Sequence, residues 1–177
     1  HGEANALDIV IDAARLIQDL PIKIILVGDG PEKNDLIKYA NGLRNIIFRD
    51  PVAKNKIPTL LKNADAMLLT LKNIDLFRYG VSPNKLYDAY ASGRPVITNV
   101  RGDINKEVEN HKLGFTAKSN NADSLALAIK NLFNTPRSER EKMAKRARAL
   151  AENTYSRDKI IDRLNKLLRE INNKKIN

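Results

Sequence analysis

Residues 82–97 read SPNKLYDAYASGRPVI and place a loop, a helix and a strand in one short stretch. Pro83 fixes φ and lacks a backbone N–H, so it suits the first turn of a helix with Ser82 as the N-cap. Gly93 ends that helix because glycine readily adopts the left-handed conformation of helix ends, and Val96 begins an apolar strand. The stretch therefore predicts a helix between a polar loop and a buried strand.

The polar groups of this stretch gather at the start of its helix. Asn84 and Lys85 occupy the first turn, and Asp88 follows one turn later. The first N–H groups of a helix have no partner within it and carry the positive end of its dipole. We therefore expect this helix start to receive an anionic, hydroxyl-rich ligand. Asp88 has a second interpretation, as a partner of Lys85 on a solvated helix face.

The composition is that of one globular domain with a substantial core. The chain has 177 residues, of which 42% are hydrophobic and 29% charged, and it has no cysteine. Disulfides and thiolate metal sites are thus excluded, which suits a reducing cytoplasm. No apolar run approaches the roughly 20 residues that a membrane span needs, and we find no signal peptide pattern.

The net charge is +10, and most of it lies in the C-terminal helices. From Arg137 onward the sequence has 13 Lys and Arg against 6 Asp and Glu. Such a basic flank keeps a protein in solution, or binds an anionic membrane surface or nucleic acid. Aromatic residues make up 5% of the chain and Trp is absent, so the stacking platforms of single-strand binders are scarce. We therefore favour a solvated face, then a membrane surface, and expect no nucleic acid.

Apolar runs alternate with helical patterns along the chain. The runs typical of buried strands lie at residues 22–27, 46–48, 66–71, 96–98 and 115–117. Helical spacing predicts helices at 4–19, 31–41, 57–63, 83–92, 104–109, 122–133, 138–152 and from Ser156 onward. This alternation predicts an α/β fold with a Rossmann-like parallel sheet flanked by helices and right-handed crossovers.

Two features favour a piece of a longer protein. No strand precedes the first helix to start the sheet. The terminal helix carries an apolar stripe that needs a cover, formed by Ile160, Ile161, Leu164, Leu167, Leu168 and Ile171. We expect one domain, residues 1–177, whose terminal helix at 156–177 packs on a missing N-terminal half.

A glycine turn follows the first strand, in the sequence VGDGPE of residues 27–32. Gly28 and Gly30 let a ligand approach the backbone, and the following helix offers free N–H groups. A dinucleotide site needs a third glycine where the chain has Lys33. Asp50 lies at the sequence distance of a ribose partner, but the broken pattern weakens that interpretation. Taken alone, the turn is better explained as tight packing between strand and helix.

Three loops follow strands, at residues 28–31, 72–84 and 99–103, and should meet at the carboxyl edge of the sheet, where doubly wound folds bind ligands. The middle loop and the helix after it carry small and polar residues, namely Lys72, Arg78, Gly80, Ser82, Asn84 and Lys85. With a helix N-terminus, these groups can neutralise a diphosphate without a metal. Asp88 can accept hydrogen bonds from the vicinal hydroxyls of a ribose.

Other catalytic patterns are weak. The two histidines, His1 and His111, are far apart and have no Ser or Cys partner in register, so a hydrolase triad is unsupported. The carboxylates Asp65 and Asp75 do not cluster with histidine as metal ligands do. The sequence predicts no metal site and no cofactor.

With these residues in place, the chain resembles the C-terminal half of a GT-B glycosyltransferase of family 4, also called glycosyl transferases group 1. The resemblance runs from about Leu7 to the end of the sequence. It depends on the order and spacing of short motifs, none of which is specific alone: VGDGPE (27–32), NIIF (45–48), ADA (64–66), PNKLYDA (83–89), ASGRPVI (91–97) and GF (114–115).

The resemblance implies a retaining, metal-independent transferase whose C-terminal half binds a nucleotide sugar, most often UDP-linked, while the acceptor docks on the N-terminal half. Residues 49–52 would border the base, and Asp88 would take the ribose hydroxyls where the family usually has Glu. The donor-binding residues carried over by position, or moved to where this chain has suitable groups, are Gly28, Gly30, Pro31, Arg49, Val52, Gly80, Ser82, Pro83, Asn84, Lys85 and Asp88.

The chain departs from the family pattern at two places. The family often has two glutamates separated by seven residues, and here the first corresponds to Gly80 and the second to Asp88. A Lys-Gly pair that usually supplies a diphosphate-binding lysine corresponds to Asn5 and Ala6. Diphosphate neutralisation therefore moves to Lys85 with Arg78 as a helper, and these two are the catalytic residues that we expect.

The SPNK form of the motif resembles a subgroup that transfers amino-deoxy sugars in bacterial O-antigen or capsule assembly, on membrane-borne lipid carriers. We therefore expect the donor-binding half of an enzyme of surface polysaccharide or lipopolysaccharide synthesis. Its place would be the cytoplasm or the inner face of the plasma membrane, as a peripheral membrane protein. Without an acceptor half, the piece should bind a donor and transfer little. The alternatives are a noncatalytic module for another nucleotide and a basic nucleic-acid-binding domain.

Overall fold

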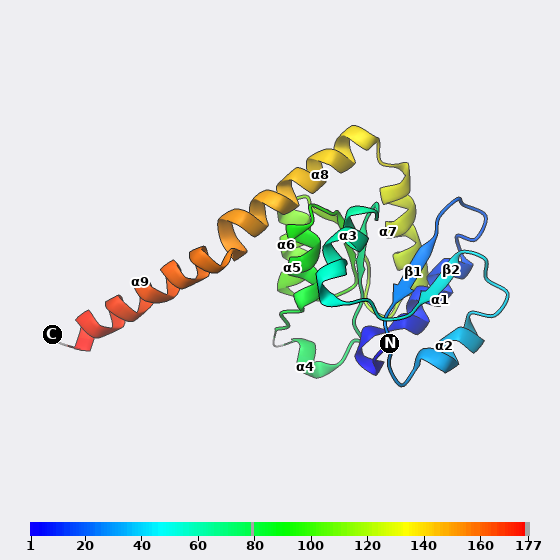
Figure 1. Ribbon diagram of the computed structural model, residues 1–177, viewed down its shortest axis with the longest axis horizontal. Helices are drawn as coiled ribbons and strands as arrows, with labels where there is room; N and C mark the ends of the chain where they lie inside the picture. The colour runs from blue at the N-terminus through cyan, green and yellow to red at the C-terminus, as the bar shows by residue number, and fades with distance from the viewer. Residues whose placement is uncertain (79, 176–177) are drawn as a thin grey trace.

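The computed structural model describes residues 1–78 and 80–175, without the side chains of Leu76, Arg78, Lys174 and Lys175. Its strands are β1 (Ile24–Val27), β2 (Ile46–Arg49), β3 (Met67–Leu69), β4 (Val96–Thr98) and β5 (Gly114–Thr116). Its helices are α1 (Leu7–Arg15), α2 (Lys33–Tyr39), α3 (Ile57–Lys62), α4 (Asp75–Arg78), α5 (Asn84–Ala91), α6 (Asp103–Asn110), α7 (Ala122–Asn134), α8 (Arg137–Leu150) and α9 (Arg157–Lys175). Figure 1 shows strands enclosed by helices, which confirms the expected α/β class.

The strands are parallel but form two separate hydrogen-bonded sheets. β1 pairs with β2, with Ile24 opposite Ile46, and the other sheet has the order β3-β4-β5. The expected parallel arrangement is confirmed, and among the described residues it is divided into two ladders because β1 and β3 are not hydrogen-bonded neighbours. Each crossover carries at least one helix, as parallel strands require.

Two apolar cores correspond to the two sheets. The first packs α1 and α7 against β1 and β2 around Ile11, Leu26 and Leu125. The second packs α5 and α6 against β3 and β4 around Tyr90 and Val108. Burying one such aliphatic side chain contributes roughly 1.5–3 kcal/mol, so these contacts outweigh the weak helix propensity of β-branched residues such as Ile11.

Several boundaries differ from the predicted ones. The helix expected at 4–19 is a short 3-10 turn, Glu3–Asn5, followed by α1. Ala6 between them has φ of 48°, and this left-handed residue separates the two segments. The four-residue helix α4 was not predicted, because its sequence carries no helical pattern. The strand expected at 66–71 is only three residues long, because the backbone after Leu69 turns to meet the N-terminal segment.

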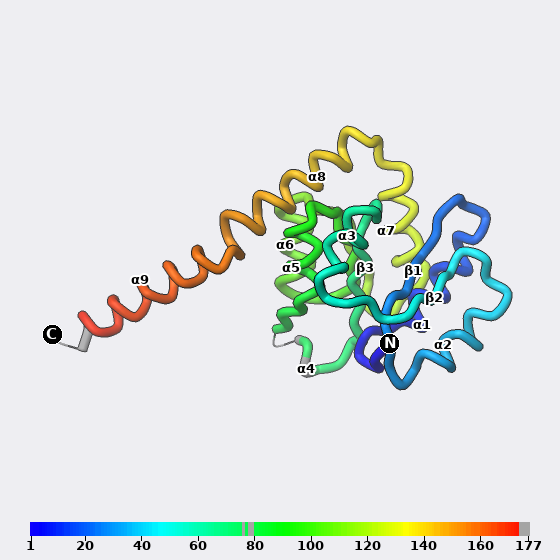
Figure 2. Tube along the Cα trace, viewed as in Figure 1, coloured from blue at the N-terminus to red at the C-terminus, as the bar shows by residue number. Residues whose placement is uncertain are grey.

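The C-terminal part leaves the body of the molecule. α8 passes into a π-helical turn, Ala151–Tyr155 (the π turn), and then into α9, which projects into solvent (Figures 1 and 2). The apolar stripe of α9 predicted from the sequence is exposed, with Leu164 at 53% and Leu167 at 53%. No helix that the structure describes is both long and apolar enough to cross a membrane.

Candidate functional site

The carboxyl edge of the two sheets is crossed by the N-terminal residues 1–5. Lys72 N donates to Ala4 O at 2.9 Å, and Thr70 Oγ1 donates to Asn5 O at 2.7 Å, both just after β3. At its other end the segment contacts the loop after β1, where Glu32 N donates to His1 O at 3.3 Å. The segment therefore joins the ends of β1 and β3 at one edge.

The glycine turn after β1 requires its two glycines. Gly28 has φ of 138° and Gly30 has φ of 149°, which residues with a side chain rarely adopt. A Cβ on Gly30 would lie 2.6 Å from His1 O. From the sequence we expected a ligand to approach the backbone at these glycines. In the structure, the backbone of His1 makes this close approach to Gly30. Gly28 N donates to Arg49 O at 3.1 Å, so the glycine turn and the expected base-side residues 49–52 are neighbours.

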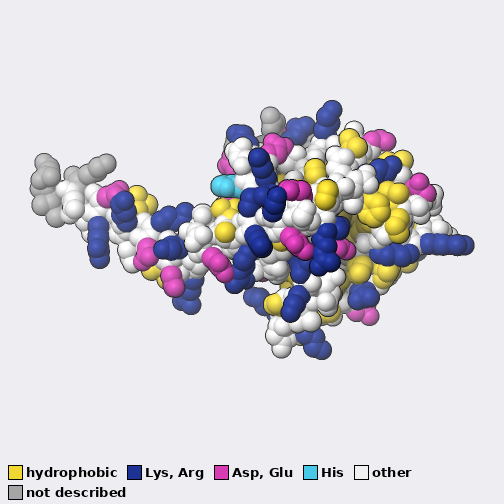
Figure 3. Space-filling view, turned by 90° about the horizontal axis from the view of Figure 1, so that it is seen from above, with side chains coloured by type: hydrophobic (Ala, Val, Ile, Leu, Met, Phe, Trp, Pro, Cys, Tyr) yellow, Lys and Arg dark blue, Asp and Glu magenta, His cyan; other side chains and the backbone are white. Residues whose placement is uncertain are grey.

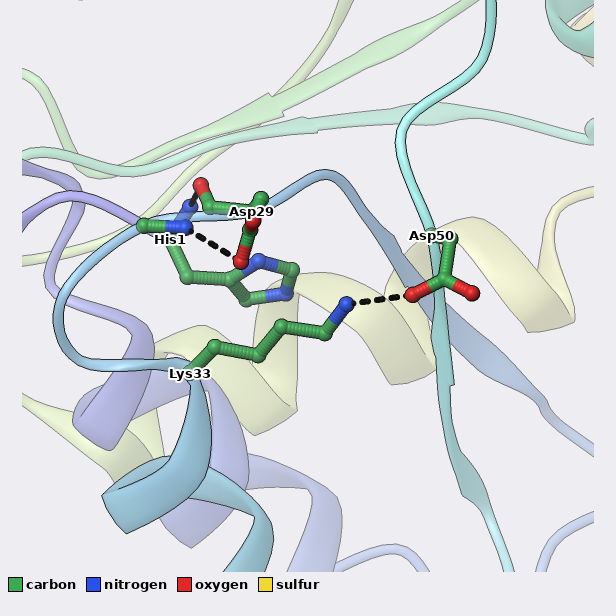
Figure 4. Close-up of polar contacts among 5 residues, drawn as sticks. His1, Asp29, Lys33 and Asp50 are labelled. Carbon is green, nitrogen blue, oxygen red and sulfur yellow. Dashed lines mark hydrogen bonds and ion pairs between the residues drawn. The ribbon is translucent and has the colours of Figure 1, made fainter.

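Lys33 and Asp50 form an ion pair beside this turn (Figure 4). Lys33 Nζ lies 2.7 Å from Asp50 Oδ1, and the two side chains are 16% and 92% exposed. The hydrogen bond from Lys33, reinforced by its charge, lowers the pKa of Asp50. One Asp50 oxygen is therefore occupied by the residue that replaces the third glycine. This geometry disfavours the dinucleotide-binding alternative.

Lys85 reaches the same N-terminal segment from the other side. Its Nζ donates to Asn5 Oδ1 at 2.8 Å, so one short segment contacts Lys85 through Asn5 and the glycine turn through His1. Partial burial of the ammonium lowers the pKa of Lys85, although the residue as a whole is exposed. Both predicted halves of the diphosphate site thus lie at one edge, joined by residues 1–5.

The start of α5 differs from the sequence expectation in its cap. Pro83 occupies the N-cap position with extended backbone, and no side chain caps the helix. Ser82 is not the N-cap, because its Oγ lies 2.8 Å from Tyr87 Oη and forms a hydrogen bond there. The N–H groups of Asn84 and Lys85 therefore lack a side-chain cap and can serve a ligand.

The remaining site residues lie around this helix start. Asp88 is exposed one turn after Lys85, and the described residues show no ion pair between them, so the solvated-pair interpretation of Asp88 is not supported. Gly80 has φ of 122° with open space around it. Arg78 belongs to α4, and its side chain lies outside the described part of the chain. Val52 is half-buried in the loop after β2.

Two polar residues of this edge, Asn99 and Asn5, were missing from the predicted site, whereas Lys72 was among the groups expected in the middle loop. Asn99 is buried and joins the ends of β3 and β4, accepting from Leu71 N at 2.9 Å and donating to Leu71 O at 3.2 Å. Lys72 Nζ lies 3.7 Å from Glu3 and 3.6 Å from Glu32, and Asn5 holds Lys85. The sequence did offer a signal for Asn99, because a polar Asn directly after an apolar strand lies at the carboxyl edge of the sheet.

Enclosed space at this edge is small. A pocket of about 10 Å³, roughly room for one water molecule, lies between the loops after β3 and β4 and is lined by Lys72, Asn99 and Arg101. Neither Gly28 nor Lys85 lines it. Among the described residues, no three His, Cys, Asp or Glu side chains group as metal ligands, and the expected metal independence stays a prediction.

Residues 1–135 match the family described as glycosyl transferases group 1. The chain belongs to that family. It is 37% identical over 100 residues to WcaI of Escherichia coli (strain K12), which is named as a colanic acid biosynthesis glycosyl transferase. That match covers 55% of this chain and 24% of WcaI.

Solved structures of low sequence identity share the fold. HepE of Anabaena, crystallised in complex with UDP, has a TM-score of 0.77 and 22% identity over 94% of this chain and 45% of its own. A mutant of TarM of S. aureus, crystallised with UDP and two further ligands, has a TM-score of 0.76 and 19% identity over 93% of this chain and 33% of its own. The chain thus spans less than half of these proteins and shares the Rossmann-like α/β fold of GT-B glycosyltransferases.

Proposed function

We propose that this chain is the donor-binding half of a retaining glycosyltransferase that takes a sugar from a UDP-sugar. The observation that carries the proposal is the meeting of the glycine turn, the N-terminal segment and Lys85 at one edge of the sheets. The UDP complexes of HepE and TarM support the choice of nucleotide. The name of WcaI supports a glycan or lipid-linked acceptor in bacterial surface polysaccharide synthesis.

The site would act mainly on the leaving group. Negative charge grows on the diphosphate as the bond to the sugar breaks. The uncapped start of α5 and the Lys85 ammonium oppose that charge, and a low-dielectric site strengthens the effect. The loop from Arg78 to Ser82 would hold the sugar, and Asp88 would accept hydrogen bonds from the ribose. The acceptor would dock on a separate N-terminal half, so we expect this chain alone to bind donor without transfer.

Calorimetry with UDP on the 177-residue chain tests the proposal. We expect Lys85→Ala to weaken UDP binding by about ten-fold or more, because a hydrogen bond to a charged group contributes roughly 1.5–3 kcal/mol. Lys23→Ala is the matched control, since Lys23 Nζ donates to Arg44 O at 2.6 Å just before β1, at the opposite end of that strand. Tighter binding of NAD or ATP than of UDP would contradict the proposal. Equal UDP affinity of the unsubstituted chain, Lys85→Ala and Lys23→Ala would contradict it as well.

The C-terminal helices have two proposed partners. The apolar stripe of α9 would pack on the acceptor-binding half, as the expected role of residues 156–177 requires. The basic side chains of α8 and α9, dark blue in Figure 3, would face anionic lipid at the inner face of the plasma membrane. Cosedimentation with vesicles tests the second point: at low salt the chain should bind vesicles rich in anionic lipid and not neutral ones, and equal binding to both contradicts it.

A further inference from the structure

A cluster of aromatic and acidic side chains lies between the donor side of α5 and the base of α9. The tyrosine cluster consists of Tyr87 and Tyr90 of α5, Glu107 of α6 and Tyr155 of the π turn. Tyr90 Oη donates to Glu107 Oε1 at 3.0 Å, and Tyr155 Oη donates to Glu107 Oε2. One carboxylate therefore holds two tyrosine hydroxyls from different helical segments.

The cluster extends to the proposed donor loop through Tyr87. The rings of Tyr87 and Tyr155 meet edge to face with centroids 4.9 Å apart, and those of Tyr90 and Tyr155 stack at 6.4 Å. Tyr87 Oη forms its 2.8 Å hydrogen bond with Ser82 Oγ. A continuous set of contacts thus runs from Glu107 through Tyr155 and Tyr87 to Ser82.

In the loop before α5, Val81 packs against the second core and Ser82 forms the hydrogen bond with Tyr87. Gly80 has open space around the position of a Cβ, and Ser82 is exposed. The loop depends on the hydroxyl of Tyr87 for its side-chain hydrogen bond, and the Tyr87 ring depends on Tyr155 for its position. A displacement of Tyr155 should therefore change the position of Ser82.

Tyr155 also occupies the joint at which α8 becomes α9. The π turn departs from α-helical hydrogen bonding, and π-helical turns are frequent at functional sites. α9 begins one residue after this turn, and Arg163 of α9 donates to Thr154 O in the turn. The direction of α9 and the position of Tyr155 therefore depend on the same five residues.

We propose that Tyr155 and Glu107 are positioning residues that tie the arrangement of the donor loop to the direction of α9. The proposal rests on the proposed donor site, and it adds a coupling between donor binding and the helix expected to contact the acceptor half. Burial and the Glu107 carboxylate raise the pKa of both Tyr90 and Tyr155, so both hydroxyls stay protonated donors at neutral pH.

Substitution of Tyr155 tests the donor side of the coupling. Tyr155→Phe keeps the ring but removes the hydroxyl that Glu107 holds. We expect UDP affinity to fall about three- to ten-fold, in the lower part of the range for coupled side chains. Tyr39→Phe is the matched control, because Tyr39 Oη likewise donates to a carboxylate, Asp12 Oδ1 at 2.6 Å, at the far end of α2. In a double-mutant cycle, Tyr155→Phe should change UDP affinity very little when Ser82→Ala is already present.

A spin-label distance tests the α9 side, measured first without nucleotide and then with saturating UDP. The sequence has no cysteine, so Asn131→Cys on α7 and Lys166→Cys on α9 give one labelled pair. We expect a narrow distance distribution that Tyr155→Phe and Glu107→Gln broaden, that Tyr39→Phe leaves unchanged and that saturating UDP narrows further.

The outcomes separate the two proposals. If the unsubstituted chain does not bind UDP, the proposed function fails, whatever the spin labels show. If it binds UDP and Tyr155→Phe binds equally well, positioning of the donor loop is overturned. A distance distribution that neither Tyr155→Phe nor UDP changes overturns the link to α9. A loss of stability alone, with affinity and distances unchanged, makes the cluster a purely structural brace.

Discussion

At the scale of single residues, two helix ends use the same hydrogen-bond pattern with different residues. After α5, Gly93 N donates to Tyr90 O and Arg94 N to Ala89 O. After α6, Lys112 N donates to Glu109 O and Leu113 N to Val108 O. This pattern needs a left-handed residue, and Gly93 has φ of 60° while Lys112 has φ of 52°. Only the first end has the residue type that adopts this conformation without strain.

Lys112→Gly should therefore stabilise the chain by about 0.5–1 kcal/mol, because it removes left-handed strain from an exposed position. The bonds from Arg146 to Lys112 O, at 3.0 and 2.8 Å, use the backbone carbonyl and survive the change. Urea unfolding followed by circular dichroism measures the effect. Gly93→Ala is the reciprocal control and should destabilise by about 1–2 kcal/mol. A Lys112→Gly chain that unfolds at lower urea would refute the assignment.

Gly114 shows how a family motif can have a purely steric cause. The GF pair at 114–115 was used as a marker of resemblance, and in the structure Gly114 pairs with Val96 in the β4–β5 ladder. A Cβ on Gly114 would lie 1.9 Å from Val96 O, so the backbone of β4 or β5 would have to shift to accommodate it. Gly114→Ala should cost about 3 kcal/mol or more, measured by the same urea unfolding. A change below about 1 kcal/mol, the centre of the range for point substitutions, would show that β5 can move away from β4.

At the scale of elements, the sequence predicted what depends on local pattern. Apolar runs located the five strands that the structure describes, and Gly93 marked the end of α5 correctly. Long-range contacts decided the rest. Ser82 has the residue type of an N-cap, but its hydroxyl bonds to Tyr87. The π turn after α8 carries Tyr155, whose hydroxyl bonds to Glu107 of α6. In the site, the Lys85–Asn5 contact joins residues 80 positions apart, which no local pattern reveals.

The tyrosine cluster gives the fold a pH dependence above about pH 10, the ordinary pKa of tyrosine. The pKa values of Tyr90 and Tyr155 are raised in the folded chain, so the unfolded chain loses these protons first. The free energy of unfolding should therefore keep its full value below that pH and should fall as the pH rises beyond it. Urea midpoints measured below, at and above the ordinary tyrosine pKa follow this fall, and Tyr155→Phe should reduce its slope. An unchanged slope in the variant would mean that Tyr155 is not held by Glu107.

At the scale of the whole molecule, α9 contributes no side chain to either of the described cores. Six apolar side chains of this helix are 43–53% exposed, although they occupy one stripe. An apolar face of this kind associates in water unless something covers it. In solution, this chain should therefore self-associate through α9 as its concentration rises, while its two cores remain intact.

Leu164→Ser tests this expectation because it interrupts the middle of the stripe without touching either core. We expect a lower association constant in sedimentation velocity, because the serine removes roughly 1.5–3 kcal/mol of apolar burial from each α9 contact. Leu127→Ser is the matched control: Leu127 on α7 is 58% exposed against 53% for Leu164, yet it lies outside the stripe. Its association should equal that of the unsubstituted chain, and urea unfolding should give the same midpoint for all three. If Leu127→Ser reduces association as much as Leu164→Ser, any exposed leucine contributes equally wherever it lies. In that case α9 is not the associating surface.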